Sequence, residues 1–378
     1  MKYIFWLVVF FIIYGSLYPF NFYVTAPLPD LLAKLIATWS QKTHLGDILG
    51  NIVLFIPYGY FGLLYFTSKH VASLIFIGFI LAIGVQVVQL YLPSREPALN
   101  DAIWNLLGIG FGLGMGLVHR FLPQSFIGNI SKSANFPLLL LCSWLAYRLM
   151  PFIPSLDWQL FKDSLKPLLL YPDLRWTNVL HDAVCWLIVG CLWRPIFSAR
   201  VSEYYLLLII PITFCLEVVI VNNYISASNV IGALLGITLW FGVFRKIRGH
   251  TTVIAILLVA ILITIAFAPF ELRDNPATFH WIPFYGFLEG SMLINTAVVF
   301  EKFFLYGALL WLARQEGAST RFVTVFSVSV IMFIEIGQIY FGNRTPEITD
   351  PILVIIIATL ILVLESNTKE LKAKTQTE

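Results

Sequence analysis

Polar residues with the spacing of a binding site flank a short connector in the first third of the chain. Gln86 and Gln89 lie three residues apart, so one face of a helix would present both amides. Asp101 and Asn105 lie four residues apart and would share a face of the following helix. Arg95 falls between the two pairs, near enough in sequence to contact Asp101. Because a guanidinium binds two oxygens of a phosphate or carboxylate at once, these residue types favour recognition of an anionic group.

The same pattern recurs near the C-terminus. At a fixed offset of 249 positions, the counterparts of Gln86, Gln89, Arg95 and Asp101 are Glu335, Gln338, Arg344 and Asp350. A tyrosine and a proline recur at the same offset, and composition does not account for so many matches. The chain is therefore predicted to contain an internal repeat.

A third, diverged copy is predicted between these two. Glu217 stands where the other copies have Gln86 and Glu335. An Asn-x-x-Gly run begins at Asn229, as one does at Asn105. The middle copy lacks the Arg and Asp of the connector, and the last copy lacks the Asn-x-x-Gly run, so only the first copy carries the whole set.

Carboxylates inside apolar runs are the strongest functional candidates. Glu217, Glu301 and Glu335 lie in such runs, where an unpaired charge costs several kcal/mol at mid-bilayer. They could also supply acid/base catalysis, but no catalytic residue is assigned. The alternative is that the polar residues bond helices to one another and that Arg95 and Asp101 fix a tight connection. The candidate ligand-binding residues are Asn51, Gln86, Gln89, Arg95, Asp101, Asn105, Glu217, Glu301, Glu335, Gln338, Arg344 and Asp350.

Composition places these residues in a membrane. Hydrophobic residues make up 59% and charged residues 12% of the 378 positions, and the mean hydropathy is +0.84, which is typical of an integral membrane protein. The net charge of +3 is too small to indicate nucleic-acid binding. The four cysteines lie in apolar runs, and no Cys/His cluster has metal-ligand spacing. We expect no metal and no cofactor.

The apolar runs predict an all-α, polytopic bundle of about twelve transmembrane helices, arranged as three repeats of four. The runs, each able to cross much of roughly 30 Å of hydrocarbon, cover 3–18, 46–66, 71–91, 100–118, 136–150, 177–193, 204–221, 228–244, 251–268, 299–313, 322–341 and 348–364. A Pro-Phe pair closes the first helix of each repeat. The predicted domains are 1–120, 136–247 and 251–364, followed by a polar tail over 365–378.

Long connectors follow the first helix of each repeat. The segments 19–45, 151–176 and 269–298 mix apolar, aromatic and charged residues, as interfacial or re-entrant helices do, although extramembrane loops have similar composition. With the N-terminus inside, fourteen Lys and Arg fall on the inner side and ten on the outer side. This excess predicts that both termini are cytoplasmic and that the Arg…Asp connectors face out.

The arrangement resembles a known family. NIVLFIPYG at 51–59 is similar to an FxPxG helix of the VanZ-like membrane proteins, and Gln86, Gln89, Arg95, Asp101 and Asn105 resemble their E-x-x-Q…R…D-x-x-x-N signature. Gln86 replaces the usual Glu. The opening Glu301-Lys302 is similar to the D-K-x-x-H of shorter members, with Leu305 in the place of His.

The resemblance implies a multi-pass protein of the bacterial cytoplasmic (inner) membrane, with links to glycopeptide resistance and the cell envelope. Membrane lipids are the expected partners, with a lipid-linked glycan or peptidoglycan precursor as a further candidate. We expect a protein that binds or handles such a component at the outer leaflet. A transporter or flippase, and a membrane scaffold with no ligand, are the alternatives. The sequence leaves open whether a reaction is catalysed and whether the chain forms oligomers.

Overall fold

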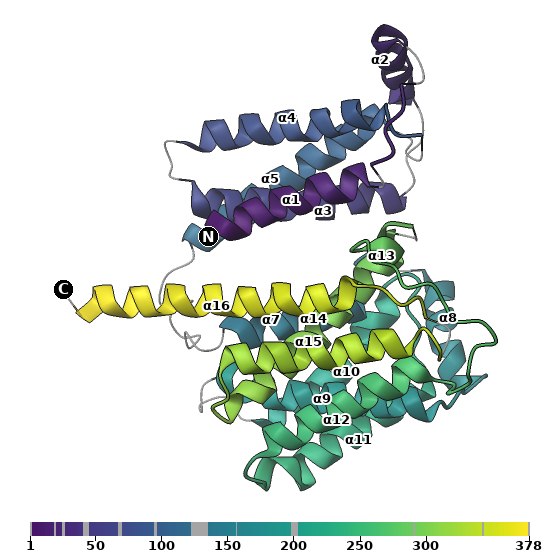
Figure 1. Cartoon of the computed structure of the whole chain (residues 1–378). Helices are drawn as coiled ribbons and strands as arrows, with labels where there is room; N and C mark the ends of the chain where they lie inside the picture. The colour runs from purple at the N-terminus through teal and green to yellow at the C-terminus, as the bar shows by residue number, and fades with distance from the viewer. Residues whose placement is uncertain are drawn as a thin grey trace. The chain divides into compact units, whose positions relative to one another are not determined.

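The structure, a computed structural model, describes residues 2–18, 20–24, 27–40, 45–66, 70–93, 97–121, 135–155, 157–197, 203–289, 292–341 and 344–376. The fold is all-helical in these residues (Figure 1). The helices are α1 (Lys2–Leu17), α2 (Leu28–Ala37), α3 (Leu45–Tyr65), α4 (Val71–Gln89), α5 (Leu99–Phe121), α7 (Asn135–Leu149), α8 (Trp158–Leu169), α9 (Trp176–Ile196), α10 (Leu206–Val219), α11 (Ala227–Gly242), α12 (His250–Phe267), α13 (Tyr285–Glu289), α14 (Met292–Gln315), α15 (Thr320–Gly337) and α16 (Thr349–Gln376).

The apolar runs form helices, as predicted. Each of the twelve runs coincides with one long helix, and the connectors hold the shorter α2, α8 and α13. Within the described residues, seven helices are long and apolar enough to cross a membrane. The all-helical, multi-pass membrane fold is therefore confirmed, while twelve spans remains a prediction. The segment expected as a polar tail continues α16 to Gln376.

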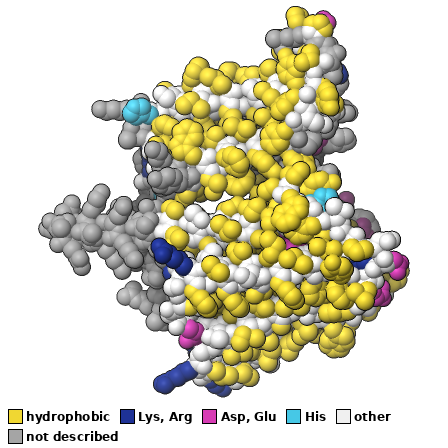
Figure 2. Space-filling view, viewed as in Figure 1, with side chains coloured by type: hydrophobic (Ala, Val, Ile, Leu, Met, Phe, Trp, Pro, Cys, Tyr) yellow, Lys and Arg dark blue, Asp and Glu magenta, His cyan; other side chains and the backbone are white. Residues whose placement is uncertain are grey.

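The chain divides into two compact units, Met1–Ile127 with Gly290–Leu293, and Gly128–Glu289 with Ile294–Glu378. Unit 1 thus contains α1 to α5, and unit 2 contains α7 to α16 except the start of α14. Figure 2 shows hydrophobic side chains over most of the visible surface of each unit. Trp6, Phe10 and Phe76 are among the large side chains that are more than half exposed. A surface of this kind is stable against lipid.

Unit 1 is held together by the close approach of α3 and α5. Gly112 lies so near α3 that a Cβ there would collide with the carbonyl oxygen of Ile56, and Gly108 lies equally near Ile52. Gly116 continues this face against Leu63. The spacing of four between the three glycines is in itself a sequence signal for a small-xxx-small helix contact, and the structure shows that contact.

Unit 2 is built around α9. This helix is apolar over most of its circumference, which is typical of a helix buried on all sides, and fourteen of its 21 residues are buried. It packs against α7, α11 and α12. Trp186 at its centre stacks edge-on against Trp144 of α7, with 4.9 Å between the ring centroids.

The three Pro-Phe corners share one backbone geometry. Phe20, Phe152 and Phe270 have φ of 62°, 61° and 67°, and each donates its N–H to the carbonyl three residues earlier, at 2.9, 2.7 and 2.6 Å. Three residues after each Phe, a backbone N–H donates to the end of the third helix of that repeat; the pairs are Tyr23–Tyr91, Ser155–Val219 and Arg273–Tyr340. This recurrence supports the predicted repeat, and it fixes the connectors beside the polar residues.

Candidate functional site

A polar cavity of about 180 Å³ lies inside unit 2. Five helices line it: α9, α12, α14, α15 and α16, together with the connector before α16. Its charged lining residues are Glu301, Lys302, Glu335, Arg344 and Asp350. Four of these five were predicted from the sequence, and the structure brings them together although they span 50 positions of the chain.

Asp350 is the best-bonded acid in the cavity. Lys302 Nζ lies 2.5 Å from its Oδ1, and the Tyr306 hydroxyl donates to its Oδ2 at 2.6 Å. Asp350 is in the first turn of α16, and both donors come from α14. The long side chains of Lys302 and Tyr306 therefore bridge two helices.

Glu335 bonds the end of α15 to the connector. One of its oxygens accepts the backbone N–H of Glu347 at 2.8 Å, and the Glu347 carboxylate in turn accepts the N–H of Gly286 at 3.1 Å. Both glutamates are buried. These bonds satisfy backbone N–H groups in the first turn of α13 and in the connector before α16, where bare N–H groups would be costly in a membrane.

Arg344 lies at the edge of the cavity and is exposed. Its carbonyl oxygen accepts a hydrogen bond from Arg273 Nη2 at 2.5 Å, but its guanidinium forms no ion pair with any described residue. The repeat offset places Arg344 beside Asp350 as Arg95 is placed beside Asp101; the two residues line one cavity, but they form no ion pair in the described residues. Lys302 takes that place because α14 carries its ammonium directly to the start of α16.

A second polar cluster in unit 2 has its charged groups paired with one another. The Arg148 guanidinium binds both oxygens of Glu217, one through Nη2 at 3.1 Å and the other through Nε, and its Nη1 lies 3.3 Å from Asp182 Oδ1. Asn229 Nδ2 donates to the other oxygen of Asp182 at 2.7 Å. The Trp144 ring lies under the guanidinium, 5.6 Å from its carbon. A buried ion pair needs this degree of bonding to offset desolvation.

One contact joins the two clusters. His181 Nε2 lies 3.3 Å from Glu301 Oε1, and both side chains are largely buried. His181 precedes Asp182 on α9, so the helix carries one residue into each cluster. The predicted residues Glu217 and Glu301 are thus parts of one connected polar region.

The polar set of unit 1 is arranged differently. Gln86 and Asn105 are 2% and 1% exposed, and Gln86 Oε1, Asp101 Oδ1 and Asn105 Oδ1 are buried without a hydrogen-bond partner among the described residues. Gln89 Nε2 donates to the Ser16 carbonyl at 2.7 Å. Asn51 lies half-buried on α3. Arg95 lies outside the described residues, and so does its predicted pairing with Asp101.

Comparison with protein families agrees with the geometry of this unit. Residues 3–122 match the family model VanZ/LLP1. The N-terminal unit is VanZ-like. The comparisons with curated proteins and with solved structures gave no match. The match ends where α5 ends, so the polar residues of unit 2 are outside it.

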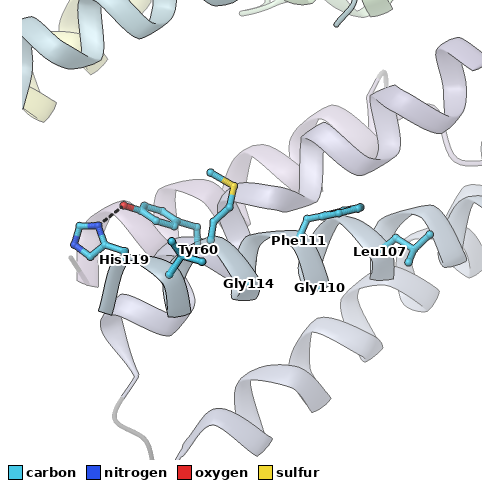
Figure 3. A pocket seen from close by; sticks show the side chains of 8 residues that line it. Tyr60, Leu107, Gly110, Phe111, Gly114 and His119 are labelled. Atoms are coloured by element: carbon cyan, nitrogen blue, oxygen red, sulfur yellow. Dashed lines mark hydrogen bonds between the residues drawn. The ribbon is translucent and has the colours of Figure 1, made fainter. Parts of the chain in front are cut away.

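A hollow of the VanZ-like unit has none of these polar residues in its lining. It is an open groove of about 690 Å³ along α5 (Figure 3), lined mainly by apolar side chains such as Leu107, Phe111 and Val118. At one end the Tyr60 hydroxyl lies 3.4 Å from His119 Nδ1. A groove of this composition suits acyl chains and offers few groups that could orient a polar ligand.

Backbone pairing matches Glu217 with Gln338, whereas the sequence pattern matched it with Glu335. Ile220 and Phe341 occupy the same position in antiparallel bridges to their connectors. Three residues before these bridges are Glu217 and Gln338, whereas Glu335 lies six residues before. Glu217 therefore takes the register of Gln338. Residues three apart lie on one helix face. The carboxylate of Glu217 is therefore on the same face as that of Glu335, but three residues nearer the connector.

Sequence reasoning missed three residues that complete the site: Arg148, Lys302 and Tyr306. Arg148 is a lone arginine near the end of the apolar helix α7, and Lys302 directly follows Glu301 on α14. An isolated cation in an apolar run is costly unless it is paired. That cost is the signal that could have identified Arg148 and Lys302, whereas a buried tyrosine gives no comparable signal.

Proposed function

We propose that this VanZ-like protein binds an anionic, lipid-linked component of the cell envelope at the outer leaflet, and that the anionic group docks at Arg344. The supporting observation is that the two buried acids of the cavity, Glu335 and Asp350, each accept a hydrogen bond within the chain, whereas the Arg344 guanidinium has no acidic partner in the described residues. The unsatisfied group at the cavity edge is therefore a cation. A guanidinium binds phosphate or carboxylate through two bonds at once.

The proposed sidedness follows from the distribution of Lys and Arg. In this proposal the protein lies in the inner membrane of a bacterium and both termini are in the cytoplasm. In this orientation the start of α16 and the end of α15 face out. Arg344 then lies at the level of the outer head groups. The cavity of about 180 Å³ holds a head group rather than an acyl chain, so the ligand would keep its chains in the bilayer.

Binding accounts for the buried charges better than transport does. Arg148 and Glu217 lie near the C-terminal ends of α7 and α10, and Asp182 and Asp350 lie near the N-terminal ends of α9 and α16. In the proposed topology all four are near the outer side. A transport pathway would need polar groups along the whole span.

The test is the lipid content of the purified protein. Wild type and Arg344→Gln are extracted in native membrane discs, and the retained lipids are identified by mass spectrometry. Loss of a charge-assisted bidentate contact predicts roughly tenfold depletion of the anionic lipid-linked component. Arg321→Gln, at the opposite end of α15, is the matched control and should retain it.

Two results would refute the proposal. One is an unchanged lipid profile in a folded Arg344→Gln variant. The other is an equal loss in Arg321→Gln, which would indicate a non-specific charge effect. Glycopeptide sensitivity of cells that carry each variant gives a second readout, and only Arg344→Gln should change it.

A further inference from the structure

Three buried oxygens in the VanZ-like unit need hydrogen-bond donors. Gln86 Oε1, Asp101 Oδ1 and Asn105 Oδ1 each lie out of contact with solvent and have no hydrogen-bond partner in the part of the chain that the structure describes. A buried acceptor without a partner costs about 1–3 kcal/mol, more when it is charged. Three in one small unit are more than helix packing requires, because apolar residues of the same size would avoid the cost.

The three oxygens are at one level of the unit. α4 and α5 form a hairpin, and Gly78 of α4 packs against Ile109 of α5. Since the helices are antiparallel, moving eight residues toward the connector from each of these brings Gln86 to the level of Asp101 along the hairpin. Asn105 is one turn from Asp101 on the same face. The exposed Asp47 of α3 is close enough to Asp101 for the two charges to repel.

The corresponding places in unit 2 are occupied by cations of the chain itself. Asp350, which the offset of 249 matches to Asp101, binds the Lys302 ammonium at 2.5 Å. In the middle copy, the guanidinium of Arg148 binds Glu217 and Asp182. Among the described residues of unit 1, no lysine or arginine pairs with Asp101.

We propose that Gln86, Asp101 and Asn105 bind the primary ammonium group of a membrane head group. An ammonium carries three N–H donors and one positive charge, which matches three buried acceptor oxygens, one of them on the carboxylate of Asp101. The inference rests on the proposed function, because it adds an amine to the chemistry of the lipid-linked ligand. A metal ion fits less well, since hard cations take about six or more oxygen ligands.

The experiment compares two lipids that differ in their N–H donors. The full-length protein is placed in discs of phosphatidylglycerol with equal amounts of phosphatidylethanolamine and phosphatidylcholine, and the lipids retained after extraction are counted by mass spectrometry. Both head groups carry the same charges, but the quaternary amine of phosphatidylcholine donates no hydrogen bond. Wild type should retain phosphatidylethanolamine roughly tenfold over phosphatidylcholine.

Two variants and one control make the result specific. Asp101→Asn removes the charge and should abolish the preference. Gln86→Lys places an ammonium of the chain in the site, as Lys302 does in unit 2, and should abolish the preference while raising thermal stability. Asp163→Asn removes the exposed acid that pairs with Lys166 on α8 and should leave the preference intact.

A second arm identifies the source of the amine. Phosphatidylcholine discs receive a polyprenyl-linked peptide precursor with a free amine, or the same precursor with that amine acetylated. Preferential retention of the free-amine form identifies the precursor as the ligand. Equal retention of the two precursor forms, together with the phosphatidylethanolamine preference of the first arm, identifies the phospholipid. Either outcome supports an ammonium site.

Three outcomes would overturn the ammonium site. Equal retention of both phospholipids by wild type is the first, and a full preference in folded Gln86→Lys is the second. The third is that wild type shows no lipid preference and the Arg95→Gln variant shows one. Arg95 would then be the donor within the chain that satisfies the three oxygens. The Arg344→Gln experiment is separate, so the ammonium site can fail while anion binding at Arg344 stands.

Discussion

The two units hold their polar residues in opposite ways. In unit 2, Arg148 and Lys302 satisfy buried acids from neighbouring helices, and the cavity-lining guanidinium of Arg344 has no ion-pair partner among the described residues. In the VanZ-like unit, close glycine contacts hold α3 and α5 together, and the buried atoms that lack a hydrogen-bond partner in the described residues are three side-chain oxygens and Trp104 Nε1. Similar polar residue types are thus bonded to one another in one unit and lack hydrogen-bond partners among the described residues of the other.

The largest expected effect comes from breaking the cluster of Arg148, Glu217 and Asp182. Arg148→Leu leaves Glu217 and Asp182 buried without their cation, and it should destabilise unit 2 by about 3–5 kcal/mol. Thermal unfolding of the purified protein in discs measures the loss. Arg194→Leu is the control, because the half-exposed Arg194–Glu203 pair contributes less than about 1 kcal/mol. Equal stability of the two variants would mean that the cluster does not hold unit 2 together.

The next effect concerns the packing that holds the VanZ-like unit. Gly112→Ala forces a methyl group against the carbonyl of Ile56 and should cost about 1–3 kcal/mol. Gly110→Ala is its matched control on the same helix, since a Cβ there has nothing within 4 Å. Protease resistance of the unit in discs reads out the difference. If Gly110→Ala proves as damaging as Gly112→Ala, helix propensity rather than close contact governs the unit.

The smallest effect tests the link between the two clusters of unit 2. A double-mutant cycle of His181→Phe and Glu301→Gln should give a coupling of about 0.5–1 kcal/mol, because the two groups form one partly buried contact at 3.3 Å. Zero coupling would make the two clusters independent. A coupling well above this range would show that they act as one network.

Much of the fold could be predicted because apolar runs in a membrane are long and clear. Each predicted run became a helix, and the spacing of Gly108, Gly112 and Gly116 identified the closest helix contact. The Pro-Phe corners also kept one geometry.

Partners of the candidate residues could not be predicted in the same way. Arg148 meets Asp182 and Glu217 across 34 and 69 positions, and neither spacing is a local signal. A contact between Arg344 and Asp350 was plausible from their spacing in the sequence. In the structure, Asp350 instead pairs with Lys302 of α14. Pairing of long side chains depends on which helices are neighbours, and that is fixed by the packing of the whole unit.

The burial of α9 has a consequence for biogenesis. This helix is apolar enough to enter a bilayer on its own, yet in the folded unit its surface is covered by protein. Two of the helices that cover it, α11 and α12, are synthesised after it. Newly made α9 must therefore begin in contact with lipid and give up that contact as the later helices arrive. The committed step in maturation of unit 2 is then the lateral association of inserted helices, and not insertion itself.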